Sequence, residues 1–319
     1  NFVGIDLAAP IVNYTPLANT TSTSARTLTT TITDVTGVPT AGAGLPVLYW
    51  KINAGTYSAV TATYISGNTY EFTFGAGVSA SDVVSYYIVA QDTAGTPNVG
   101  SAPSGGSGFT INPPAAATPP ASPSTYTITP TISGTKTVGS GGDYATLTAA
   151  INALNAAELT GPVVLSLTQA AYNAGTGETI PLPAIAVNSG SSSTNTITIR
   201  PASGVTPTIS GLANSSCLVR INGADYVTID GDNPDGGTNR DLTITNTGTT
   251  SPATVCVQSL GTAAGATDNT IKNVNISTGS NAATSYGIWV GSATIGTAGD
   301  DNDNLTIQNN AISKAYYGI

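Results

Sequence analysis

Hydrophobic and polar residues alternate along most of this chain in short runs, which is the pattern of half-buried β-strands rather than of helices. In the first third, turns rich in Gly, Asn and Asp separate these runs. The runs lie at 25–33, 47–52, 59–65, 69–74, 83–90 and 109–112. Six or seven short strands in so short a segment predict a β-sandwich.

A six-residue phrase recurs in the last third of the chain. It stands at 241–246 (DLTITN), 268–273 (DNTIKN) and 304–309 (NLTIQN), and related strand-like runs follow at 255–258, 288–291 and 316–319. Imperfect repeats of this length are typical of solenoids, because each unit buries its apolar face only against its neighbours. We predict coils of roughly 30 residues with at least two strands each, and we expect the solenoid to continue beyond residue 319.

The internal order of the phrase predicts a role for each position. The Ile residues should form one interior file: Ile244, Ile271 and Ile307. The Asn residues should form a ladder at a corner or, alternatively, a row that binds sugars: Asn246, Asn273 and Asn309. The Thr residues should either be ordinary β-branched strand residues of the scaffold or form an exposed file that binds a flat or glycosidic surface: Thr243, Thr270 and Thr306.

One helix interrupts the β pattern and marks the start of the second domain. Leu147, Ala150, Ile151 and Leu154 share a helical face after a potential N-cap at 141–143, and Gly161-Pro162 should end the helix, which then caps the solenoid. The proline-rich run 113–125 should be a semi-rigid spacer. The predicted organisation is all-β: a sandwich at 1–112, a linker at 113–125 and a parallel β-helix at 126–319.

Composition narrows the function. Only 8% of the residues are charged, there is no His, and the net charge is −9. Nucleic-acid binding is disfavoured because phosphate contacts need clustered Lys and Arg, and any site built on imidazole is excluded. No apolar run reaches the roughly 20 residues of a membrane span. A polar, charge-poor β chain of this kind favours an extracellular or cell-surface location.

The densest acidic cluster is Asp230, Asp232 and Asp235, followed by Arg240. Three interpretations remain open: a plain turn between strands, a turn stabilised by calcium, or a catalytic carboxylate pair. The bidentate Glu of an EF-hand is missing. Calcium is therefore the one cofactor that the sequence suggests, and no catalytic residue is assigned.

The two cysteines test the predicted strand register. In the run 217–221, Arg220 should face outward, and strict alternation then places Cys217 inward. In the run 255–258, Val255 and Val257 should face inward, which places Cys256 outward. Opposite faces favour two free thiols over a disulfide.

Two segments resemble known families. The run 137–152 (TVGSGGDYATLTAAIN) resembles the opening segment of pectin-lyase-like right-handed parallel β-helices, and 48–51 (LYWK) with 84–92 (VSYYIVAQD) resembles bacterial Ig-like or fibronectin-III-like modules. The triplet 92–94 (DTA) resembles the sequon that carries O-linked glycans in Bacteroidota, which would make Thr93 a glycosylation site.

With these segments in this order, the chain resembles the large repetitive adhesins of Bacteroidota. The resemblance implies a structural or adhesive filament protein whose partners are surface glycans or other cell-surface and secretion components, with self-association into filaments as an option. A polysaccharide-binding or polysaccharide-degrading β-helix enzyme is the first alternative, although no family catalytic motif matches. A passive fibre or sheath subunit is the second.

Overall fold

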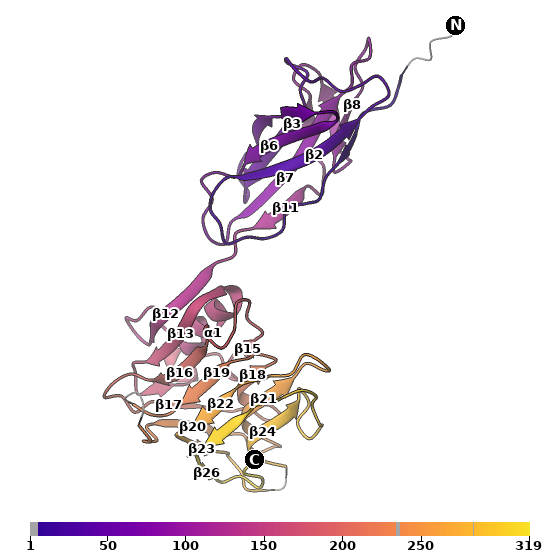
Figure 1. Ribbon diagram of the computed structural model, residues 1–319. Coiled ribbons are helices and arrows are strands. Elements are labelled where there is room, and N and C mark those ends of the chain that lie inside the picture. The colour runs from indigo at the N-terminus through magenta and orange to yellow at the C-terminus, as the bar shows by residue number, and fades with distance from the viewer. Residues whose placement is uncertain (1–5, 234–236, 283) are drawn as a thin grey trace. The chain divides into compact units, whose positions relative to one another are not determined.

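The computed structural model describes residues 6–233, 237–282 and 284–319 (Figure 1). The chain divides between Pro130 and Thr131 into two units, each built around its own hydrophobic core. Over these residues the fold is all-β apart from one α-helix and one short 3-10 turn, as the sequence pattern predicts. Within the described residues, no helix has both the length and the apolar character needed to cross a membrane.

Two antiparallel sheets form the N-terminal unit. The first has the order β1 (Ile11–Asn13), β2 (Arg26–Thr33), β6 (Thr69–Phe74) and β5 (Thr63–Ser66). The second has the order β11 (Ser124–Thr127), β7 (Val83–Gln91), β3 (Val47–Ile52) and β4 (Ser58–Thr61), with β8 (Val99–Ala102) also on β7. Leu28 and Phe72 from the first sheet and Leu48 and Ile88 from the second are buried in one shared core.

The segment 113–125 is not a linker, contrary to the prediction. It contains β10 (Ala115–Thr118), which pairs with β9 (Ser107–Thr110), and the start of β11, which pairs with β7 inside the N-terminal unit. All five prolines of the segment lie outside the strands, where no N–H is needed for a ladder. The domain boundary therefore falls at residue 130, and 126–130 belong to the first unit.

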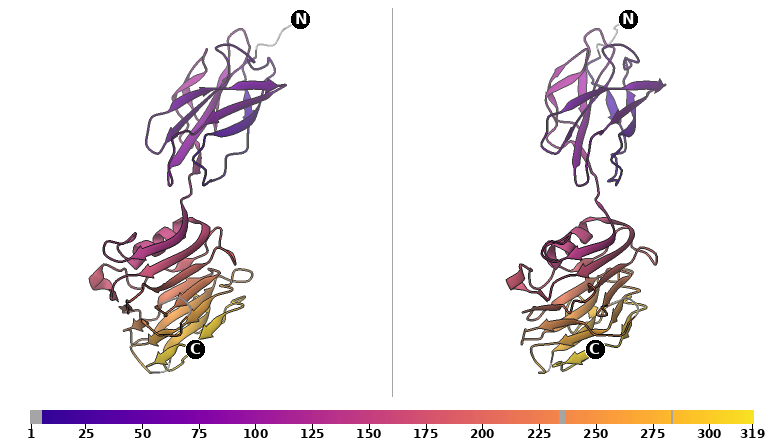
Figure 2. Two further views of the ribbon diagram at one scale, coloured as in Figure 1. Left: turned by 60° about the vertical axis from the view of Figure 1, so that its left-hand side comes forward. Right: turned by 90° about the vertical axis from the view of Figure 1, so that its left-hand side faces the viewer.

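The C-terminal unit is a right-handed-type parallel β-solenoid of about four turns. Figure 2 shows its rungs stacked one on another in both views. Sheet 1 contains β12 (Thr131–Val138), β13 (Glu158–Leu167), β16 (Ile197–Pro201), β19 (Val227–Asp230), β22 (Thr270–Lys272) and β25 (Thr306–Gln308). Sheet 2 contains β14 (Ala171–Tyr172), β17 (Thr208–Gly211), β20 (Leu242–Asn246), β23 (Val274–Ser277) and β26 (Ala311–Ser313). Sheet 3 contains β15 (Ile185–Ala186), β18 (Cys217–Asn222), β21 (Ala253–Ser259) and β24 (Tyr286–Ser292).

Interior residues stack in register along each sheet. Sheet 1 carries the file Leu165, Ile199, Ile229, Ile271 and Ile307, and sheet 2 carries the file Ile209, Ile244, Ile276 and Ile312. The predicted stack of Ile271 on Ile307 is confirmed, whereas the placement of Ile244 in the same file is wrong. Each coil has three strands, so two strands in one coil can carry the same phrase.

The helix α1 (Leu147–Ala156) covers the start of the solenoid core, and its buried face consists of the four residues predicted. The N-cap is Thr146, so the predicted N-cap at 141–143 is wrong. The buried carboxylate of Glu178 accepts from the backbone N–H groups of Leu147 and Thr148, both at 2.7 Å. These acceptors satisfy amides that a helix N-terminus leaves free. The helix ends before β13, so the predicted stop at Gly161-Pro162 is wrong. That pair lies in β13 beside a register shift.

A disulfide joins Cys217 to Cys256, contrary to the prediction of free thiols. Leu218 and Val219 are consecutive, yet both are buried in the solenoid core, so the inward–outward alternation breaks at Leu218. Cys217 is thereby placed with Cys256 in a separate cluster that Trp289 also contacts. The Cα atoms are 5.9 Å apart, and the bridge links β18 to β21 in successive coils.

Candidate functional site

The predicted acidic cluster lies where the chain turns from β19 in sheet 1 to β20 in sheet 2. Asp230 ends β19 and is only 7% exposed. Its carboxylate accepts from the backbone N–H of Asp232 at 3.1 Å and from the Asn273 side chain at 2.8 Å, and its Oδ2 lies 3.0 Å from Lys272 Nζ. The charge of Asp230 is thus balanced by a neighbouring strand of the same sheet.

Asp232 is 1% exposed and shapes the loop that follows. Its two carboxylate oxygens accept from the backbone N–H groups of Gly237 at 2.8 Å and Asn239 at 3.1 Å. Asp235 falls outside the described residues, so the three-carboxylate calcium site remains a prediction. The bonds of Asp232 are those of a turn, whereas Asp230 also bonds across to Lys272 and Asn273 in the next coil.

Gly231 permits this corner. A Cβ on Gly231 would overlap the carbonyl oxygen of Asn273, so no other residue fits without displacing the next coil. Its N–H donates to Lys272 O at 2.9 Å. Glycine at this point is therefore required by close packing between coils.

Arg240 is directed away from the acidic cluster toward the corner two coils further on. Its Nε donates to the Asn309 carbonyl and its guanidinium to Asn309 Oδ1, both at 2.8 Å. Asn309 in turn donates to Thr238 O at 2.8 Å. The loop 237–240 is thus fastened along the edge between sheets 1 and 2, and Arg240 does not form the acid–base pair that a catalytic interpretation requires.

Two of the three predicted ladder residues stack at this same edge. Asn309 Nδ2 donates to Asn273 Oδ1 at 2.8 Å, and Asn273 Nδ2 donates to Asp230, which makes the ladder Asp230, Asn273 and Asn309. Asn246 is not part of it. The phrase 241–246 forms β20 in sheet 2, whereas the other two phrases form β22 and β25 in sheet 1.

Asn246 instead occupies the next corner, between sheets 2 and 3, and is fully buried. It accepts from the backbone N–H groups of Ala213 and Gly248 and donates to the carbonyls of Ala213 and Ala253, at 2.8–3.0 Å. With its amide fully used by the backbone, Asn246 has no free group for a ligand.

The outer face of sheet 1 carries a straight file of four threonines, which we call the threonine file. Its members pair in register on β16, β19, β22 and β25: Thr198, Thr228, Thr270 and Thr306. The first three are partly exposed and the last is exposed, and none of their hydroxyls is hydrogen-bonded to another described residue. Successive hydroxyls are about 4.8 Å apart because that is the spacing of strands.

A second, more polar row lies on the outer face of sheet 2. Thr208, Thr243 and Asn275 pair in register there. The Asn275 amide donates to Arg240 O at 2.7 Å, so the loop 237–240 uses one end of this row. Thr243 therefore belongs to a different file from Thr270 and Thr306, contrary to the expectation of one Thr file.

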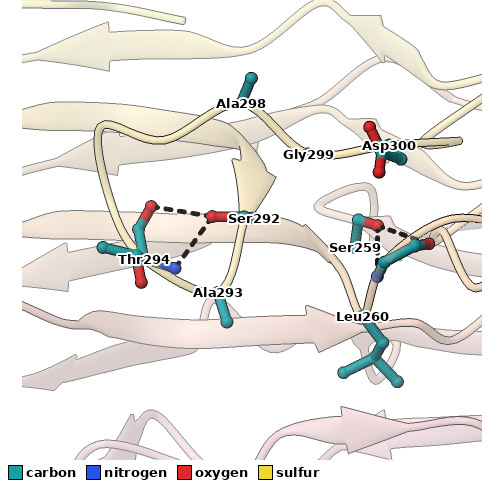
Figure 3. Close-up of a pocket in the computed structure, with 9 residues that line it drawn as sticks. Ser259, Leu260, Ser292, Ala293, Thr294, Ala298, Gly299 and Asp300 are labelled. Carbon is teal, nitrogen blue, oxygen red and sulfur yellow. Dashed lines mark hydrogen bonds between the residues drawn. The ribbon is translucent and has the colours of Figure 1, made fainter.

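Two hollows in this unit lie on the sheet 3 side. Figure 3 shows one, with a volume of about 320 Å³, between the ends of β21 and β24. Its serine hydroxyls are engaged in local turns: Ser259 Oγ bonds the backbone of Gly261, and Ser292 Oγ bonds that of Thr294. Asp300 accepts from the Thr262 hydroxyl at 3.1 Å. These groups stabilise loops and offer no nucleophile with a base beside it.

Thr93, the predicted glycosylation site, is exposed at the end of β7, and its hydroxyl donates to the Thr36 carbonyl. Next to it, Asp92 is fully buried and lies with Asp6 and Asp34 in a group of three carboxylates. Sequence reasoning missed this group because its members are far apart in the chain. The available signal was that Asp34 directly follows one predicted strand and Asp92 lies two residues after the end of another.

No protein-family model matches the chain, and a search of curated proteins finds none that matches it.

Proposed function

We propose that this protein is a structural and adhesive component of the cell surface or extracellular space, in which the β-solenoid is a rigid scaffold. The observation that carries the proposal is the threonine file. Its hydroxyls are unbonded within the described residues, evenly spaced and held on a backbone whose core files fix their positions.

Rigid, repeated hydroxyls suit a polyhydroxylated surface. Each hydrogen bond contributes only about 1 kcal/mol net, but several contacts on one rigid face act together. The groups of the acidic loop, by contrast, are committed to internal bonds.

The finer likenesses are part of the same proposal. An Ig-like N-terminal module and a pectin-lyase-like solenoid are consistent with two antiparallel sheets around one core and three parallel sheets behind a capping helix. We extend this to a surface filament of the kind that large Bacteroidota adhesins form, with Thr93 as a glycan attachment site.

The test is binding of the full chain to immobilised neutral and acidic polysaccharides, compared with Thr228→Val/Thr270→Val. Valine keeps the shape and removes the hydroxyl, so we expect roughly a 30-fold loss of affinity from two hydrogen bonds of about 1 kcal/mol each. The matched control is Thr27→Val/Thr73→Val on exposed strand positions of the N-terminal unit, which should bind as wild type.

Equal binding by both double variants, or no binding by the wild type, would refute the proposal. Polysaccharide turnover that disappears in a folded Asp232→Asn variant would favour the enzyme instead. Head-to-tail polymers that ignore every glycan would favour a passive fibre.

A further inference from the structure

The second hollow on the sheet 3 side lies beside the corner where the chain passes from sheet 2 to sheet 3. Its volume is about 490 Å³, which is within the range of sites for small molecules. The loop 293–296, which follows β24 and also borders the hollow of Figure 3, forms one wall. The side chains around it are hydroxyl-bearing or apolar: Ser215, Ser251, Thr284, Tyr286, Thr294 and Ile295.

The three hydroxyl residues of the corner have a backbone conformation that suits other residue types better. Ser215, Ser251 and Thr284 each lie two residues before a paired position of β18, β21 and β24, so they stack in successive coils. Their φ angles are 49°, 42° and 76°, in the left-handed region that favours Gly and Asn. The corner between sheets 1 and 2 has Asn273 and Asn309 at its left-handed positions. Residues kept in an unfavourable conformation of this kind cluster at ligand sites.

The fold leaves most of the hydrogen-bonding capacity of these hydroxyls unused. Ser251 Oγ and Thr284 Oγ1 lie 3.0 Å apart and bond each other. In the parts of the chain that the structure describes, the hydroxyls of Ser215, Tyr286 and Thr294 have no hydrogen-bond partner. The hollow therefore offers several donors and acceptors that point to a polar ligand.

The walls of the hollow are held in place by the protein. The ring of Trp289 meets the Tyr286 ring edge-on, with centroids 5.1 Å apart, and the Tyr317 ring stacks on it at 5.1 Å. Tyr286 also packs against the cluster that contains the disulfide. On the loop side, the Gln258 amide donates to the Ala293 carbonyl at 3.2 Å. Binding would therefore need little ordering of the protein, which favours affinity.

The chemistry of the lining selects the ligand class. None of the described residues that line the hollow is charged, so a charged ligand would find no counter-charge there. A wholly apolar ligand would desolvate the hydroxyls without replacing their bonds to water. A neutral sugar satisfies both conditions, because its hydroxyl groups can bond the corner and its apolar C–H face can pack on an aromatic ring.

We propose that this hollow binds one neutral sugar unit of a glycan. The hydroxyls of Ser251 and Thr284 bond the hydroxyl groups of the sugar, and Tyr286 and Ile295 contact its apolar face. The site is on a different face from the threonine file of sheet 1, so it does not depend on glycan binding there.

The experiment is titration of the full chain, followed by NMR, with the methyl glycosides of glucose, galactose, mannose and N-acetylglucosamine. Methyl glucuronide is the charged comparison. We expect saturable binding of at least one neutral glycoside at a single site, with a Kd on the order of 1 mM, which three or four net hydrogen bonds supply. Thr228→Val/Thr270→Val should bind these glycosides as wild type, so this result stays distinguishable from that for the threonine file.

The decisive variant is Ser251→Gly/Thr284→Gly. It removes two hydroxyls, so it should weaken binding of the glycoside roughly 30-fold. Because Gly adopts the left-handed conformation without steric cost, the unfolding temperature should not fall. The matched control is Ala263→Gly, at another left-handed position, φ 59°, that does not line the hollow, and it should bind as wild type.

Three results would overturn the proposal. The first is the absence of saturable binding of every neutral glycoside to the wild type. The second is an affinity of Ser251→Gly/Thr284→Gly that equals that of the wild type or of Ala263→Gly. The third is tighter binding of methyl glucuronide than of any neutral glycoside.

Discussion

Removing the Cys217–Cys256 disulfide should destabilise the solenoid more than any single surface change. The bridge joins residues 39 apart in sequence and links two successive coils. Both cysteines are at most 1% exposed, in a cluster that Trp289 contacts. The perturbation is Cys217→Ala/Cys256→Ala, with chemically reduced wild type as a second route to the same loss.

The magnitude follows from the length of the loop that the bridge closes. Restricting the unfolded chain over a 39-residue separation contributes about 4 kcal/mol at 25 °C in the chain-entropy description. For a unit of this size, each kcal/mol corresponds to roughly 2–4 °C in unfolding temperature. We therefore expect the solenoid transition to fall by about 10 °C.

The assay is urea and thermal unfolding in a Trp50→Phe background, so that Trp289 alone reports the solenoid. Thiol titration of the denatured, unreduced wild type should find no free thiol, since both cysteines are bridged. The N-terminal unit, followed through Trp50 in a Trp289→Phe background, is the internal control. Two free thiols in that titration, or a solenoid transition that moves by less than about 2 °C, would refute the reasoning.

Three further predictions concern packing, a buried corner and pH. Ile271→Ala should lower the free energy of unfolding of the solenoid by about 3 kcal/mol, because it leaves a cavity in an interior file. Thr270→Ala, on the outer face of the same strand, should change that free energy by no more than about 0.5 kcal/mol. Urea unfolding compares the two variants, and similar losses would contradict the register. Asn246→Ala should cost about 3 kcal/mol because it leaves buried backbone groups unpaired, with Asn309→Ala as the more exposed comparison at roughly 1 kcal/mol. Burial raises the pKa of Tyr87 to about 12, so as the pH rises this tyrosine ionises in the unfolded chain before it does in the folded one. The stability of the N-terminal unit should therefore be constant below pH 10 and fall between pH 10 and 12. Unfolding midpoints that do not change over that window would contradict the prediction.

Several local features could be predicted from the sequence because they depend on short-range periodicity. The buried face of α1 follows from spacings of three and four residues, and the bounds of β3 and β6 follow from runs of aromatic and β-branched residues between turns. The stack of Ile271 on Ile307 follows from two phrases with the same internal order. In each case the residues nearby in sequence decide which side is buried.

Other features needed contacts that no local pattern describes. The prolines of 113–125 suggested a spacer, but the residues between them pair with strands β9 and β7. A single break in alternation at Leu218 reversed the face of Cys217 and allowed the disulfide. Asp6, Asp34 and Asp92 converge only because the sheets bring the segments before β1 and after β2 and β7 together.

The recurring phrase shows where the two kinds of information meet. The sequence alone determined that its Ile points inward and its Thr outward, since a strand repeats every two residues. Only the tertiary structure decided that 241–246 lies in sheet 2 while 268–273 and 304–309 stack in sheet 1. The reason is that all three faces of a coil need the same alternation, whereas the loop lengths and corner bonds of the folded coil select the face that each phrase occupies.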